Sequence, residues 1–164
     1  YGTRSVSIWN ASNGSLVWDS KNDFEQIVKQ RSPAFFNSSN DENEFDGRSD
    51  DKGPEPEGVT VGMVNGKMYA FVGFERVGGI ALYDISNPNN PTFAHYITTR
   101  NFQGDPTLGT SGNLAPEGMV FIPASQSPNR TALLVVTYEV SGSVQIFELG
   151  TQESNTSLQN ETSN

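Results

Sequence analysis

The sequence predicts an all-β fold of short strands, and three observations predict it. Several short segments alternate apolar and polar residues with a period of two, which is typical of half-buried strands. Turn-forming residues are abundant, with 16 Gly and 9 Pro among 164 residues. A whole unit of strands and turns also occurs more than once, and such self-similarity indicates a repeat architecture.

The first elements are a predicted hairpin and a helix. Residues 4–10 alternate in the manner of a strand, and the turn at Asn13-Gly14 leads to a second strand at residues 15–18. Residues 23–30 predict one short helix. Residues 37–54 predict a polar, acidic loop insertion.

The repeated unit begins with a Pro-Glu-Gly motif at residues 56–58 and again at residues 116–118. In each copy we expect a strand, a turn, a second strand that ends in an aromatic-Glu pair, and a third strand after a glycine turn. The second strands are expected at 68–73 and 132–137, the pairs are Phe74-Glu75 and Tyr138-Glu139, and the third strands lie in 79–85 and 143–149. Asn65-Gly66 is a strong hairpin signal.

A fourth strand is predicted at residues 92–97. Units of four strands at a period of about 60 to 75 residues favour β-propeller blades, and a β-sandwich of the same strands is the alternative. We expect residues 1–150 to be blades from the C-terminal part of a larger propeller, and residues 151–164 to be a flexible Ser/Thr/Asn-rich tail. A propeller needs about four to eight blades. The remaining blades are therefore expected on another chain or fragment, or through homo-assembly.

Composition excludes several classes of protein. The net charge is −9 with one histidine, a balance that disfavours nucleic acid and anionic membranes as partners and attracts cations. No apolar run is long enough for a transmembrane segment. The chain contains no cysteine, and it begins at Tyr1 without a signal peptide. These features lead us to expect a processed or excised fragment.

Six Asn-x-Ser/Thr sequons predict N-linked glycans and a secreted, extracellular or cell-surface location. They are Asn10, Asn13, Asn37, Asn129, Asn155 and Asn160. Three of them, at Asn10, Asn13 and Asn129, fall in predicted turns, where a glycan projects into water. The alternative is that a Ser- and Asn-rich chain carries accidental sequons.

The densest acidic segment, residues 40–58, carries eight carboxylates and two basic residues. Ca²⁺ prefers about six to eight oxygen ligands, which such a loop supplies. The segment is not an EF-hand, because Gly53 occupies the position of the last glutamate ligand. A solvated acidic loop is the alternative.

Glutamates also recur at equivalent points of the two units: Glu57 with Glu117, and Glu75 with Glu139. If the innermost strands line a channel, these carboxylates converge there and need a cation or a basic group such as Arg76 to neutralise them. The alternative is a clamp in which each glutamate accepts backbone N–H groups. The candidate calcium ligands are Asp46, Asp50, Asp51, Glu55, Glu57, Glu75, Glu117 and Glu139.

Motifs of covalent catalysis are missing from the sequence. It contains no G-x-S-x-G motif and no cysteine, and the single histidine, His95, has no evident partner. We assign no catalytic residue.

Three long motifs carry a resemblance to a known family. Residues 46–61, 69–80 and 115–119 resemble the mesenchyme-specific cell-surface glycoproteins of biomineralising animals, whose bacterial relatives are secreted choice-of-anchor propeller proteins, some labelled alkaline-phosphatase-like. The resemblance covers residues 1–149 and the C-terminal part of a longer chain. It implies a propeller, an extracellular location, glycosylation and a link to calcium.

The resulting hypothesis is an extracellular calcium-binding structural or matrix glycoprotein that acts in biomineralisation or cell-surface assembly. One alternative is an extracellular calcium-dependent phosphoesterase, a metal-dependent hydrolase of phosphoric esters, in which bridging Ca²⁺ activates water. It would need phosphate-binding basic residues, for which Arg48, Lys52 and Arg76 are the candidates. The other alternative is an adhesion or filament subunit whose open blades pair with other chains.

Overall fold

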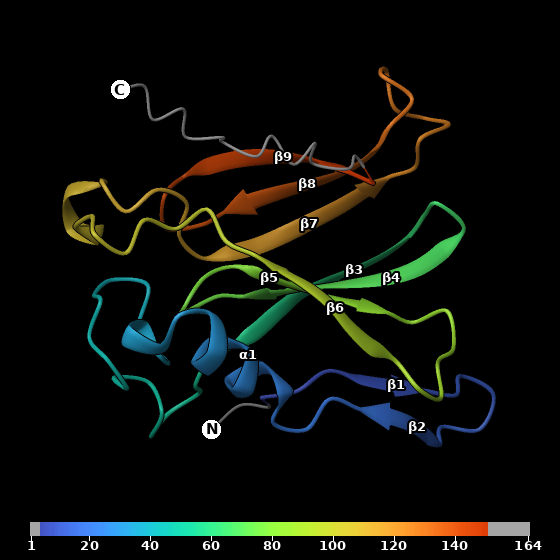
Figure 1. The fold of residues 1–164 in the computed structure, drawn as a ribbon, viewed down its shortest axis with the longest axis horizontal. Helices are drawn as coiled ribbons and strands as arrows, with labels where there is room; N and C mark the ends of the chain where they lie inside the picture. The colour runs from blue at the N-terminus through green and yellow to red at the C-terminus, as the bar shows by residue number, and fades with distance from the viewer. Residues whose placement is uncertain (1–3, 151–164) are drawn as a thin grey trace, which may run out of the picture.

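The computed structural model describes residues 4–150, which form three antiparallel sheets and one α-helix (Figure 1). The predicted all-β class is confirmed. The first sheet pairs β1 (Ser7–Trp9) with β2 (Leu16–Asp19). The second has the order β3 (Pro56–Val64), β4 (Lys67–Phe74), β5 (Ile80–Asp84) and β6 (Thr92–Ile97). The third has the order β7 (Pro116–Ile122), β8 (Ala132–Tyr138) and β9 (Ser143–Leu149).

Strands in each sheet follow one another in chain order, and each is paired antiparallel with the next. Asn65 and Gly66 form the β3–β4 turn with φ angles of 50° and 80°, the backbone that an Asn-Gly hairpin requires. The predicted strand at 92–97 is confirmed as β6, and the predicted hairpin at the N-terminal end is confirmed as β1–β2.

The Pro-Glu-Gly motif builds the same local structure twice. Glu55 and Ala115, which precede the two prolines, both have positive φ, at 55° and 60°. A shift of register follows in β3 and β7, between Pro56 and Val59 in the first copy. The backbone N–H of Glu75 donates to Glu55 at 2.8 Å, and that of Glu139 donates to Ala115 at 2.9 Å. The sequence repeat is therefore a structural repeat.

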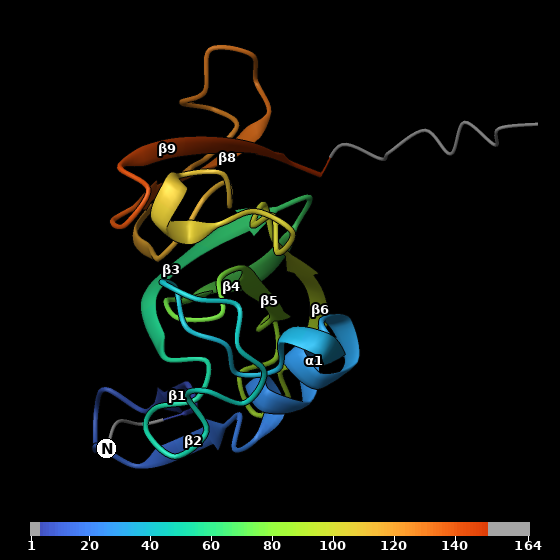
Figure 2. The same cartoon turned by 90° about the vertical axis from the view of Figure 1, so that its left-hand side faces the viewer.

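Two apolar layers cover the two faces of the β3–β6 sheet (Figure 2). On one face the β7–β9 sheet packs through Phe121, whose ring lies 6.1 Å from that of Phe71. A Cβ at Gly62 would lie 2.3 Å from the Phe121 ring, so only glycine permits this approach. Strands β3 and β7 thus lie side by side.

Helix α1 (Asp23–Arg31) covers the other face of the β3–β6 sheet and confirms the predicted helix. Its apolar side chains Phe24, Ile27 and Val28 are buried there. Acidic residues in its first turn and basic residues in its last turn complement the helix dipole. Two short 3₁₀-helices, η1 (Pro33–Phe35) and η2 (Pro106–Leu108), lie in the connecting segments.

Two further predictions concern the whole chain. Within residues 4–150 the sheets do not close into a barrel, and they hold two, four and three strands. The assignment of these sheets as propeller blades is therefore an interpretation. None of the helices in this part of the chain has the length and apolar character needed to cross a membrane. The predicted tail at 151–164 lies outside the described residues.

Candidate functional site

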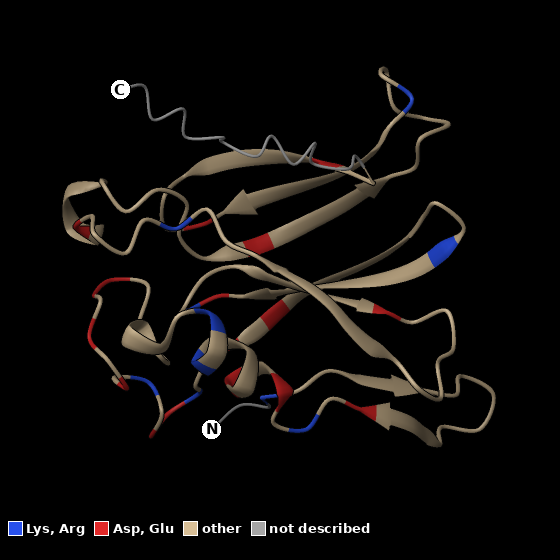
Figure 3. Cartoon of the chain, in the orientation of Figure 1, with Lys and Arg blue, Asp and Glu red and all other residues tan. Residues whose placement is uncertain are grey.

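Acidic residues lie in the loop before β3 and near the beginnings of β3 and β7 (Figure 3). The structural repeat brings Glu55 beside Glu75 through the backbone hydrogen bond at the end of β4. The close approach of β3 and β7 places Gly58 against the backbone oxygen of Glu117, where an added Cβ would lie 2.2 Å away. The Pro-Glu-Gly motifs of the two copies therefore lie close together in the structure.

Glu75 is the buried member of this cluster, with 6% of its surface exposed. Its Oε1 accepts a hydrogen bond from Asn40 Nδ2 at 3.1 Å, and its Oε2 lies 3.2 Å from Arg76 Nε. Burial raises the pKa of Glu75 from 4.5 to about 7, although the positive charge of Arg76 acts in the opposite direction. Negative charge on Glu55, Glu57 and Glu139 raises this pKa further.

Glu55 is the residue on which nearby basic side chains converge. Its Oε2 accepts a hydrogen bond from Arg76 Nε at 2.7 Å, its Oε1 binds Lys52, and Arg48 lies 3.9 Å from it. Burial acts to raise the pKa of Glu55, but the hydrogen bonds from Lys52 and Arg76 outweigh it, so the pKa lies below its ordinary value. Glu55 therefore stays ionised beside a glutamate that resists ionisation.

The three basic residues that a phosphoesterase would need for binding phosphate all contact Glu55. Arg48 also pairs with Asp51 at 2.6 Å, and Arg76 donates to Asn40 Oδ1 at 3.2 Å. A phosphate group would have to compete with these carboxylates for the same cations. The arrangement is that of an internal ion-pair network.

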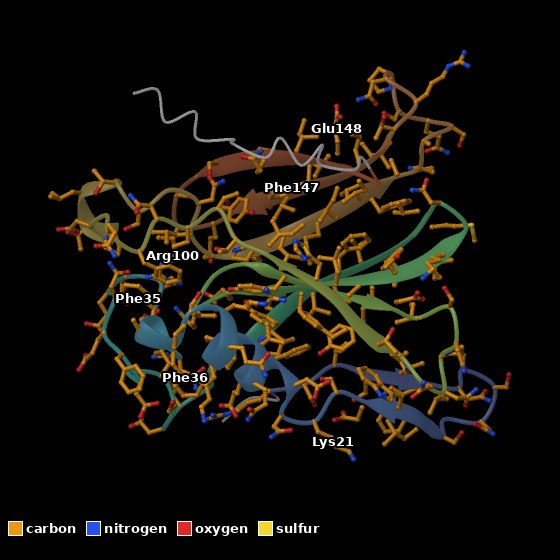
Figure 4. The ribbon with its side chains drawn as sticks, in the orientation of Figure 1. Lys21, Phe35, Phe36, Arg100, Phe147 and Glu148 are labelled. Atoms are coloured by element: carbon orange, nitrogen blue, oxygen red, sulfur yellow. The ribbon has the colours of Figure 1, made fainter. Side chains whose placement is uncertain are left out.

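Arg100 connects the acidic loop to the segment that follows β4 through hydrogen bonds (Figure 4). It is 6% exposed, and its guanidinium donates to the backbone oxygens of Arg76 and Glu42, at 2.9 and 3.0 Å, and to Asn43 Oδ1 at 2.8 Å. Its Cζ lies 4.7 Å from the centre of the Phe102 ring. Burial lowers the pKa of Arg100 to about 10, so the side chain keeps its charge at neutral pH.

The structure brings only part of the predicted calcium-ligand set together. Glu55 and Glu75 share Arg76, and Glu57, Glu117 and Glu139 are exposed nearby on the strands and turn of the repeat. The loop residues Asp46, Asp50 and Asp51 are engaged elsewhere or exposed: Asp46 accepts a hydrogen bond from Ser49, and Asp50 faces solvent. Across residues 4–150, no three histidine or carboxylate side chains are grouped so as to hold a metal ion.

Predicted sequons differ in their accessibility. Asn10, Asn13 and Asn129 are exposed in turns, and each side-chain oxygen accepts the backbone N–H of the Ser or Thr two residues later, at 2.9, 2.9 and 3.1 Å. Asn37 is fully buried, and its Nδ2 donates to Ser49 Oγ at 2.8 Å. Asn155 and Asn160 lie outside the described residues.

Sequence reasoning missed Asn40 and Arg100 as members of the site. In the sequence, Asn40 is one polar residue among many in the acidic segment, and Arg100 stands alone between predicted strands. Their contacts join residues 35 and 58 positions apart, so no local pattern could have revealed them.

Two known proteins are similar to this chain, and the name of one of them refers to the cell surface. Gigasin-3a of Magallana gigas is 32% identical over 164 aligned residues, which cover 91% of this chain and 56% of that protein. The mesenchyme-specific cell surface glycoprotein of Strongylocentrotus purpuratus is 30% identical over 105 residues, which cover 56% of this chain and 13% of that protein. The chain thus spans about half the length of the first relative. No solved structure matches it significantly.

A family model gives the assignment of the chain itself. The model of the choice-of-anchor I domain matches residues 1–88, which include the β1–β2 hairpin, the acidic loop and the first copy of the repeat up to β5. The match extends over more than half of the 164 residues. The chain therefore belongs to the choice-of-anchor I domain family.

Proposed function

We propose that the chain is part of an extracellular, N-glycosylated structural protein of a cell surface or matrix. The observation that carries the proposal is the geometry of three sequons, in which exposed turns present Asn10, Asn13 and Asn129 to solvent. A sequon that carries a glycan needs an asparagine side chain that is accessible from solvent, and these three exposed positions meet that requirement. The printed name of the sea urchin relative, a cell surface glycoprotein, supports the same location.

The sheets serve in this proposal as blades of a β-propeller. Support comes from the meander order of strands in each sheet and from the packing of β3 against β7, which makes the first strands of successive units neighbours. A scaffold of stacked sheets offers a rigid surface, and its turns hold the glycans away from the packed faces.

Calcium is the ligand that we propose for the cluster around Glu75. A net charge of −9 attracts cations, and the exposed Glu57 and Glu139 lie close enough to affect the pKa of Glu75. Side-chain rotation of these two residues toward Glu75 would supply carboxylate oxygens, and Asn40 would add an amide oxygen. In a matrix protein this site would link the scaffold to calcium-rich surroundings, as the biomineralisation hypothesis requires.

The location is tested on intact cells of the source organism. An antibody against the described part of the chain is expected to label cells that have not been permeabilised, or the matrix around them. A membrane-impermeant biotinylation reagent should label the same protein. Labelling that appears only after permeabilisation, together with a lack of biotinylation, would contradict the proposal.

A further inference from the structure

The chain contains two Asn-Gly pairs, and both lie in the turns of hairpins. Asn13-Gly14 lies between β1 and β2, and Asn65-Gly66 connects β3 to β4. All four residues are exposed, and a Cβ on either glycine would have no neighbour within 4 Å. The two pairs are therefore similarly open to solvent, but the hydrogen bonds around them differ.

An Asn-Gly pair modifies itself slowly in water. The backbone nitrogen of the glycine attacks Cγ of the asparagine, and the new N–Cγ bond closes a succinimide ring. The Cγ–Nδ2 bond breaks, and ammonia leaves with the proton of the glycine nitrogen. Water then opens the ring at either carbonyl group, which yields aspartate or isoaspartate. Glycine obstructs this attack least because it has no side chain, and water is the only co-reactant.

Two hydrogen bonds restrain the reaction at Asn13-Gly14. The attacking group, the N–H of Gly14, donates to the backbone oxygen of Asn10 at 2.8 Å. The side-chain oxygen of Asn13 accepts the N–H of Ser15 at 2.9 Å, which fixes the orientation of the side-chain amide. Both hydrogen bonds must break before the ring closes, so the fold opposes succinimide formation at this pair.

Neither restraint exists at Asn65-Gly66. Among residues 4–150, the N–H of Gly66 and the side chain of Asn65 have no hydrogen-bond partner. The φ angles of 50° and 80° are those of a type I′ turn, whose central N–H groups are not needed for the strand pairing. We propose that Asn65 is a site of spontaneous deamidation in the folded protein, and that the fold protects Asn13 from the same reaction.

Isoaspartate at position 65 would alter the hairpin and its surroundings. It inserts a CH₂ group into the main chain of a turn whose flanking residues, Val64 and Lys67, are paired. It also places a negative charge at the end of β9, since a Cβ on Gly150 would lie 2.7 Å from Asn65 Nδ2. Deamidation is thus an irreversible change where the β3–β4 turn meets the β7–β9 sheet, and it requires neither calcium nor glycans.

The test compares the two pairs within one molecule. The full chain is produced in bacteria, which attach no N-glycan to Asn13, and is incubated at pH 8 in buffer and in urea. Peptide mass spectrometry then follows the conversion of each asparagine. In buffer, Asn65 is expected to react about tenfold faster than Asn13, which corresponds to ~1.4 kcal/mol from the two hydrogen bonds at Asn13-Gly14. In urea the turns are unfolded, and the two rates are expected to become similar.

Asn65→Gln is the control variant, because ring closure from the longer side chain is slower. It is expected to abolish the mass change at position 65 and to leave the rate at Asn13 unchanged. The isoaspartate form, separated by chromatography, is expected to melt at a lower temperature than the unmodified protein.

The proposal is overturned if Asn13 reacts in buffer as fast as Asn65, or if Asn65 stays intact in buffer while it reacts in urea. Equal melting temperatures of the unmodified and isoaspartate forms would overturn the effect on the hairpin. None of these results depends on where the protein is located. Surface labelling of cells therefore tests the proposed function separately.

Discussion

Glu75 illustrates how one residue couples the stability of the site to pH. Its carboxyl group is buried, it has Asn40 and Arg76 as polar partners, and its pKa is raised to about 7. The unfolded chain releases this proton near its ordinary pKa of 4.5. Between these two values the folded state binds more protons than the unfolded state, so this group makes stability fall as pH rises.

Replacing Glu75 with glutamine is expected to remove that pH dependence. From pH 4.5 to pH 7.5 the unmodified protein should lose about 3 kcal/mol of unfolding free energy relative to Glu75→Gln, because glutamine carries no charge to bury. Urea unfolding in the presence of EDTA measures the difference. The control is Glu148→Gln, an exposed glutamate on β9 that does not contribute to the raised pKa of Glu75, and it should follow the unmodified protein. Parallel pH profiles for Glu75→Gln and the unmodified protein would refute the assignment.

The role of Glu75 could be predicted from the sequence only in part. The repeat identified Glu75 and Glu139 as equivalent positions, and each directly follows the second strand of its unit. The sequence could not tell which of the two is buried. That difference arises from Asn40 in the acidic loop, which has no counterpart in the second copy and reaches Glu75 across 35 positions.

At the scale of elements, glycines decide how closely the sheets approach. Gly62 on β3 lies under the Phe121 ring, and Gly58 lies under the backbone of β7. Any side chain at either position would push the two sheets apart. The Pro-Glu-Gly motif therefore sets both a turn and an interface.

The Gly62→Ala substitution is expected to destabilise the protein by about 1 to 3 kcal/mol, since the added methyl group overlaps an aromatic ring in a packed layer. The matched control is Gly47→Ala in the acidic loop, where a Cβ would have no neighbour closer than 3.6 Å. That control should change stability by less than about 0.5 kcal/mol. Thermal and urea unfolding measure both variants, and equal effects of the two substitutions would contradict the packing described.

Strands and hairpins were largely predictable because their signals are local. Asn65-Gly66 specifies a turn through its own backbone preferences, and the alternating residues of β6 and β9 specify strands through their own periodicity. The acidic segment behaved differently. Residues 37–40 are polar yet buried. The side-chain amides of Asn37 and Asn40 donate hydrogen bonds to Glu25, Ser49 and Glu75, which lie 12 to 35 positions away.

At the scale of the whole molecule, the main feature is the stacking of the sheets. Sheets stack through their apolar faces, and both outer faces of the stack expose further apolar side chains, including Val61 on β3 and Val144 on β9. The sequence repeat predicted the stacking of equivalent units. The repeat could not show where the β1–β2 hairpin packs. That position depends on the contact between the Trp18 and Tyr83 rings, which are far apart in the sequence.

Calcium is expected to stabilise the protein against heat if the cluster around Glu75 binds it. A free calcium concentration of about one hundred times the dissociation constant would add about 2.7 kcal/mol. Differential scanning fluorimetry at pH 8 with calcium, with magnesium and with EDTA measures the effect. Glu75→Gln should reduce the shift, whereas Asp50→Asn, in the loop away from Glu75, should preserve it. Melting curves that are the same in calcium and in EDTA would contradict calcium binding by the cluster around Glu75.

Glycopeptide mapping of protein from its natural source tests whether the chain passes through the secretory pathway and is displayed outside the cell. The account predicts glycans on Asn10, Asn13 or Asn129, whose side chains are exposed in turns, and none on Asn37, which is buried and hydrogen-bonded to Ser49. Asn37 thus serves as an internal control within the same molecule. Unmodified peptides at all three exposed sequons would contradict the account.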